Sequence, residues 1–165
     1  MLKVLSFIGG LAGAAGLSQY PEFSQQYTQR LAGQIDALSQ VVEDFDASAL
    51  RSGLTRSEAL DQMQGTQFLD DRRSDMQRTF LRHEVLTAHF THLQSASPMQ
   101  RMMMPHRISD AETLTGTWDD FVPAMPINLP GAVAAGAGFI AGSTVLGLCL
   151  TFLLWPFRRR ARAPA

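Results

Sequence analysis

The chain has 165 residues, a mass of 18.1 kDa and a formal net charge of −1 at pH 7. Its single cysteine excludes an intrachain disulfide. Five of the 14 lysine and arginine residues lie near the two ends, whereas all 15 aspartate and glutamate residues lie between them. This negatively charged middle excludes nucleic-acid binding there, because phosphate contacts need clustered Lys and Arg.

Residues 1–20 form an apolar segment that is only marginally long enough to cross a membrane. Three interpretations are open. A cleaved signal peptide fits the Lys3 start, a short transmembrane helix is the second, and a helix lying in the membrane interface, disfavoured by the lack of a polar face, is the third. We expect the short span, because small residues four apart let another helix approach closely. These residues are Gly9 and Gly13, and Ala12 and Gly16.

Residues 21–97 are predicted to form two long helices with a short helix between them. From Pro21 to about Leu50 the apolar residues recur in steps of four and three, which is helical spacing. Thr55, followed three residues later by Glu58, is a capping box that opens the short helix. The second long helix is expected to start at Thr66 and to end before a proline, residue 98.

Each long helix has one narrow apolar stripe and a charged back, so neither is stable alone. The stripes predict an antiparallel, coiled-coil-like hairpin, roughly 40 Å long at 1.5 Å per residue. The predicted seam consists of Phe23, Tyr27, Leu31, Ile35, Leu38, Val42 and Phe45 on the first helix, and Leu69, Met76, Phe80, Leu86, Phe90 and Leu93 on the second.

Residues 98–130 are expected to form a connector along the membrane surface. The segment begins with a methionine cluster, continues as a polar loop and contains prolines that forbid a continuous helix. Trp118 and Phe121 are predicted to enter the interface, where aromatic side chains are enriched.

The second apolar segment, residues 131–157, is predicted to be a transmembrane helix. It has no charged residue, and its core of about 24 residues would extend roughly 36 Å as a helix. The predicted anchors are Trp155 and the basic residues Arg158, Arg159 and Arg160, which open a cytoplasmic tail, 158–165. A small-residue face repeats every four residues, at Ala134, Gly138 and Gly142.

Together these segments predict an all-α membrane protein with two transmembrane helices flanking a long antiparallel hairpin. A basic tail on the inside places both termini in the cytoplasm and residues 21–130 in the periplasm of a bacterium. The bilayer is therefore one expected partner.

The sequence contains no signature of an enzyme or of a cofactor site. It has no phosphate-binding glycine loop, no nucleophile elbow, no zinc-protease motif and no cysteine pair. The weak metal candidates are His83, His89, His92 and His106, with neighbouring methionines whose thioethers suit Cu(I). Solvated or partner-facing histidines are the simpler interpretation.

Several short stretches resemble an uncharacterised proteobacterial inner-membrane family, a domain of unknown function. They are Gln19-Tyr20-Pro21-Glu22-Phe23, Gln25-Gln26-Tyr27, Gln29-Arg30-Leu31, Gly53-Leu54 and Trp118-Asp119-Asp120-Phe121-Val122-Pro123-Ala124 before the glycine-rich segment. The resemblance implies a bacterial membrane setting and brings no activity or cofactor.

The leading hypothesis is a non-catalytic accessory or scaffold subunit of the inner membrane. It would bind other membrane proteins, or itself as a homo-oligomer, through its small-residue spans and its hairpin. The alternative is a periplasmic copper- or zinc-handling protein that uses the histidines and methionines. Membrane sensing through the connector is a third hypothesis.

Overall fold

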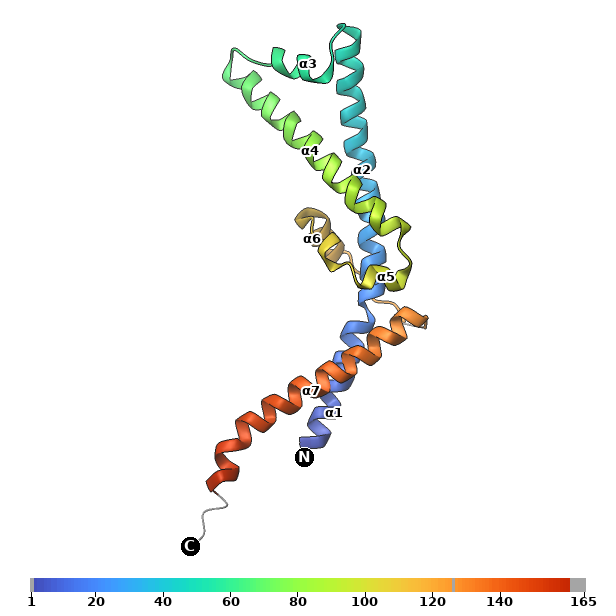
Figure 1. The fold of residues 1–165 in the computed structure, drawn as a ribbon, viewed down its shortest axis with the longest axis vertical. Coiled ribbons are helices and arrows are strands. Elements are labelled where there is room, and N and C mark those ends of the chain that lie inside the picture. The colour runs from blue at the N-terminus through green and yellow to red at the C-terminus, as the bar shows by residue number, and fades with distance from the viewer. Residues whose placement is uncertain (1, 126, 161–165) are drawn as a thin grey trace. The chain divides into compact units, whose positions relative to one another are not determined.

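The computed structural model describes residues 2–125 and 127–160, with the backbone alone for residue 2 and for 154–160. Throughout the described residues every regular element is a helix (Figure 1), which confirms the predicted all-α class. In chain order they are α1 (Leu2–Ser18), α2 (Tyr20–Arg51), α3 (Arg56–Gln62), α4 (Gln67–Ser95), α5 (Pro98–Met102), the 3₁₀ helix η1 (Pro105–Arg107), α6 (Ala111–Asp119) and α7 (Leu129–Arg160).

The chain divides into two compact units, each of which is described by itself. The first unit comprises residues 1–25, 98–103 and 121–165, and contains α1 and α7. The second comprises residues 26–97 and 104–120, and contains most of α2 together with α3, α4 and α6. Residues 98–130, predicted to form one connector, have members in both units.

Local sequence signals account for the helix boundaries of the hairpin. Thr55 caps α3 in a complete capping box, because its side chain accepts from the Glu58 amide while the Glu58 carboxylate accepts from the Thr55 amide. Thr66 caps α4 by accepting from the Leu69 amide. The loops on both sides of α3 carry glycines with positive φ, Gly53 and Gly65, a backbone conformation that favours glycine.

In the second unit α2 and α4 pack antiparallel. Ser39 hydrogen-bonds His83 at 2.8 Å, and the rings of Phe45 and Phe80 meet edge to face at 5.2 Å. Residue numbers in these contacts rise along α2 as they fall along α4, so the two helices run antiparallel, as in a hairpin. The buried cluster between the helices consists of Tyr27, Leu31, Ile35, Leu86 and Leu93, with Leu38 and Phe90 packed against it.

The structure shows contacts of the predicted seam and connector that the sequence did not predict. Phe23 lies in the first unit, where its ring packs against Phe121 at 5.6 Å between centroids. Phe121, predicted to enter the membrane interface, thus has an aromatic partner within the chain. Met104 and Ile108, placed by sequence in the surface connector, pack against the hairpin core. The polar loop expected after them is helix α6, capped by Asp110.

Replacement of Leu93 by alanine should destabilise the hairpin. Leu93 is completely buried, so we expect Leu93→Ala to lower the free energy of unfolding by about 2–5 kcal/mol. Leu81→Ala is the matched control on the same helix, since Leu81 is 62% exposed and should cost about 0.5 kcal/mol or less. Urea unfolding of the full chain in detergent, followed by circular dichroism, measures both. Equal effects would contradict the packing described above.

Candidate functional site

In the first unit, glycines bring the backbones of α1 and α7 into contact. A Cβ atom added at Gly13 would overlap the carbonyl oxygen of Gly138, and one added at Gly138 would lie 2.7 Å from the carbonyl carbon of Gly13. A Cβ at Gly142 would lie 3.0 Å from the carbonyl carbon of Gly9. Larger side chains would force the helices apart, so these four glycines permit the close approach. Four of the five small residues predicted to pack are thus brought together, and the fifth, Ala134, is buried.

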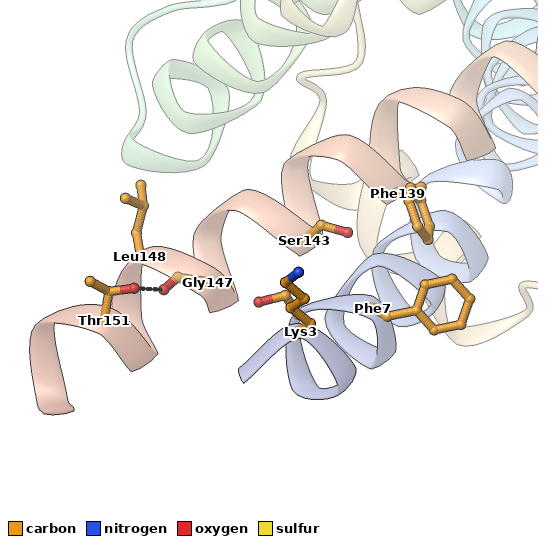
Figure 2. A pocket seen from close by; sticks show the side chains of 8 residues that line it. Lys3, Phe7, Phe139, Ser143, Gly147, Leu148 and Thr151 are labelled. Carbon is orange, nitrogen blue, oxygen red and sulfur yellow. Dashed lines mark hydrogen bonds between the residues drawn. The ribbon is translucent and has the colours of Figure 1, made fainter. Parts of the chain in front are cut away.

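The second small-residue pair of the N-terminal segment does not take part in this contact. Ala12 and Gly16 are exposed, and a Cβ at Gly16 would meet no atom within 4 Å. The helices run antiparallel: Gly13 lies against Gly138, and Ser6 lies against Gly147. The rings of Phe7 and Phe139 meet edge to face at 5.6 Å beside the glycine contact (Figure 2).

The outward faces of α1 and α7 are apolar and are not covered by other described residues of their unit. Side chains on these faces are 43–75% exposed, although water disfavours such contiguous apolar surfaces. They are Val4, Leu5, Phe7, Ile8, Leu11 and Leu17 on α1, and Val133, Ile140, Val145, Leu148, Phe152 and Leu153 on α7. Of the described helices, α7 is long and apolar enough to cross a membrane, over residues 129–153. Only 11% of the residues in its most apolar stretch are buried. A core helix of a soluble protein would be mostly buried.

Of the remaining predicted membrane-interface anchors, the structure describes the side chain of Trp118 alone. Trp118, on α6, is 72% exposed. The backbone of α7 continues to Arg160, but the side chains of Trp155, Arg158, Arg159 and Arg160 lie outside the described residues.

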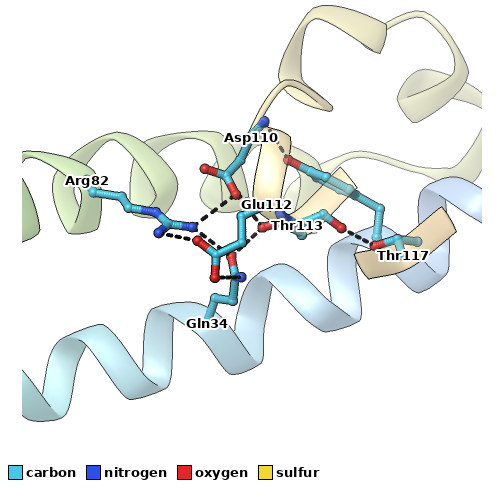
Figure 3. A network of polar contacts seen from close by, with 7 residues as sticks. Gln34, Arg82, Asp110, Glu112, Thr113 and Thr117 are labelled. Carbon is cyan, nitrogen blue, oxygen red and sulfur yellow. Dashed lines mark hydrogen bonds and ion pairs between the residues drawn. The ribbon is translucent and has the colours of Figure 1, made fainter. Parts of the chain in front are cut away.

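In the second unit, a polar network joins α6 to both helices of the hairpin (Figure 3). Arg82 of α4 pairs with Asp110 at 3.2 Å and with Glu112 at 2.6 Å. Gln34 of α2 accepts from Arg82 at 3.4 Å and lies against the hydroxyl of Thr113. One arginine and one glutamine therefore hold the start of α6 to α4 and α2 together.

Asp110 is the central group of this network. Its carboxylate accepts from the Thr113 amide at 2.9 Å, which caps α6, and from the Thr113 hydroxyl at 2.7 Å. Burial raises the pKa of Asp110, but the hydrogen bonds from Thr113 and the charge of Arg82 outweigh burial and hold the pKa below its usual value. The ionised form of the Asp110 carboxylate is thus the one that these hydrogen bonds and the Arg82 charge stabilise.

The other end of α6 is held by a second ion pair. Arg30 of α2 pairs with Asp120 at 2.7 Å, across Gly116, where a Cβ would lie 2.5 Å from the Arg30 guanidinium. Sequence analysis missed this pair because Asp120 has no nearby basic residue in the chain. The signals that could have located α6 were the capping residue Asp110 and the acidic Glu112 in its first turn.

The four histidines are not arranged as a metal centre in the described part of the chain, where no group of three or more His, Cys, Asp or Glu side chains is placed to hold an ion. His83 hydrogen-bonds Ser39. Burial lowers the pKa of His89, and the positive charges of Arg107 and of two neighbouring histidines lower it further. No observation among these residues favours the metal-handling hypothesis.

Comparison with known proteins gives one match. A family model described as a protein of unknown function, DUF2937, matches residues 1–159. The chain belongs to this family. The predicted membership in a domain of unknown function is therefore confirmed. No curated protein and no solved structure matches the chain.

The glycine contact between α1 and α7 can be tested by cross-linking. In a Cys149→Ala background, the pair Ser6→Cys and Gly147→Cys should form a disulfide on oxidation. A Cβ at Gly147 lies 3.8 Å from that of Ser6, within the usual disulfide range of about 3.5–4.5 Å. Adding Gly13→Leu should abolish the cross-link, because Gly138 leaves no space for the side chain.

Gly16→Leu is the matched control, because the same side chain enters open space there and should leave the cross-link intact. Mobility of the oxidised chain on a denaturing gel measures all three results. If the two leucine variants behaved alike, α1 and α7 would not meet at their glycines.

The Asp110 network predicts a pH dependence for the attachment of α6. Because the folded-state pKa of Asp110 lies below its usual value of 3.8, its contribution to stability is present above that value and is lost as pH falls below it. In a Trp155→Phe background, the fluorescence anisotropy of Trp118 should therefore drop in acid. Asp110→Asn should show reduced anisotropy already at pH 7, whereas Asp119→Asn, on the same helix, should behave like the parent. An acid transition that survives in Asp110→Asn would refute this assignment.

Proposed function

We propose that this protein is a non-catalytic accessory or scaffold subunit of the bacterial inner membrane. Two transmembrane helices, α1 and α7, would carry a helical hairpin that binds other membrane proteins or a second copy of the chain. The observation that carries the proposal is the pairing of a backbone-to-backbone glycine contact with an apolar outer surface. Hydrocarbon or other apolar helices are the environment that such a surface needs.

The proposed topology follows from the antiparallel pair. If both helices span, the start of α1 and the end of α7 lie on one side and everything between them lies on the other. Arginines at positions 158–160 favour the cytoplasm for that first side. Helix α1 has 17 residues, or roughly 25 Å, somewhat less than the roughly 30 Å of hydrocarbon. Local thinning of the bilayer accommodates a mismatch of that size at modest cost.

The hairpin supplies the surface for partner binding outside the membrane. Leu81 and Val85 lie one turn apart on α4 and are both exposed, at 62% and 43%. Leu50 and Phe68, close to the two ends of the α3 segment, are also exposed. Aromatic and aliphatic side chains of this kind are the usual anchors of a protein interface.

Purification in mild detergent tests the proposal. We expect the tagged chain to retain a stoichiometric partner or a second copy through two chromatographic steps. The double variant Leu81→Glu and Val85→Glu should lose it, since charges would enter the apolar contact. Gln77→Glu, at an exposed position of the same helix, should not.

Two results would count against the proposal. A clean monomer without a partner, in a detergent that preserves the helix content, would remove the accessory role. Release of the wild-type chain from membranes by alkaline extraction would remove the membrane setting itself.

A further inference from the structure

A groove of about 450 Å³ lies between α1 and α7, at the end where α1 begins (Figure 2). Lys3, Ser6 and Phe7 contribute from α1, and residues from Phe139 to Thr151 contribute from α7. Beyond the glycine contacts the two helices leave a space between them that no side chain of the described chain fills. The groove is open along one side, so a ligand would lie along it and not be enclosed by it.

Both apolar and polar side chains line the groove. Phe7 and Phe139 form an aromatic pair along it, and Leu148 extends the apolar surface. The polar groups are the Lys3 ammonium and hydroxyls, including that of Ser143, whose oxygen is buried and makes no hydrogen bond within the described residues. An amphipathic ligand with one anionic end matches this distribution.

Lys3 has no ion-pair partner among the residues that the structure describes. Neither α1 nor α7 contains an aspartate or a glutamate. An anion bound in the groove would therefore be the counter-ion of the Lys3 ammonium.

Lys3 lies near the end of the helix pair that carries the arginines. Lys3 and Thr151 line the same groove, and Thr151 is two residues from the end of the apolar stretch Leu129–Leu153. From Thr151, α7 continues to Arg160, roughly 13 Å further along at 1.5 Å per residue. If α7 spans with its arginines at the cytoplasmic surface, Lys3 lies close to the cytoplasmic edge of the hydrocarbon. Its long stem can then reach the phosphate layer.

We infer that this groove binds one anionic phospholipid of the cytoplasmic leaflet. The lipid phosphate accepts from the Lys3 ammonium, and an acyl chain lies along Phe7, Phe139 and Leu148. The arginines at positions 158–160 and 162, on the same side of the proposed span, attract anionic lipids to this end of the helix pair. The inference rests on the proposed membrane setting of α1 and α7.

Native mass spectrometry of the full chain in detergent tests the inference. Titration with dioleoylphosphatidylglycerol should give one saturable adduct that dioleoylphosphatidylcholine does not give. Lys3→Gln should weaken this adduct about fivefold, the loss expected for one lysine near anionic lipid. Lys3→Arg should retain it, and so should the control Arg51→Gln, which removes one exposed positive charge from the hairpin end of α2.

A second variant separates occupancy of the groove from charge. Thr151→Trp fills the groove while leaving Lys3 and the arginines in place, and it should also lose the adduct. Equal phosphatidylglycerol binding by wild type, Lys3→Gln and Thr151→Trp would overturn the inference. Cross-linking of Lys3 to a protein carboxylate by a carbodiimide in native membranes would overturn it too, in favour of an acidic partner helix.

Alkaline extraction of each variant keeps the two proposals distinguishable. A chain that stays in the membrane but binds lipid independently of Lys3 contradicts the lipid site alone. A wild-type chain that is extracted contradicts the membrane setting, and with it both proposals.

Discussion

The backbone contact between α1 and α7 is the constraint from which the rest of the account follows. Glycines at positions 9, 13, 138 and 142 bring the two backbones into contact. Most of the large apolar side chains of both helices remain exposed. In water this arrangement would gain little from the hydrophobic effect, whereas in hydrocarbon close packing is what holds helices together. The geometry thus suits a membrane better than an aqueous core.

The second unit differs in having an apolar core. The side chains of this core are buried between α2 and α4, whereas Leu81 and Val85 of the same unit are exposed. What completes it is α6, held by Arg82 and Gln34 at one end and by Arg30 at the other. Because α6 presents threonines to the hairpin, side-chain hydrogen bonds and ion pairs hold it more than apolar burial does. These polar contacts tie α6 to both helices of the hairpin.

Sequence analysis captured what depends on local patterns and missed what depends on contacts between distant residues. Helical spacing, the caps at Thr55 and Thr66 and the glycine repeats are all local, and the elements they predict are present. Helix α6 was missed because it has nine residues, buries threonines, and is held by residues far away in the chain. The contact of Phe23 with Phe121 was missed for the same reason. The charge partner of Asp120 is 90 residues away, and no spacing rule reaches it.

The central claim, that hydrocarbon surrounds α7, is tested most directly by the single native thiol. Cys149 lies exposed on α7, so it would react readily in water. In intact membranes the account predicts no reaction of Cys149 with a charged, membrane-impermeant maleimide from either side, followed by full reaction after solubilisation in SDS. A cysteine at Ser57, on α3, should react without detergent once the outer compartment is open. Full labelling of Cys149 in untreated membranes would contradict the account.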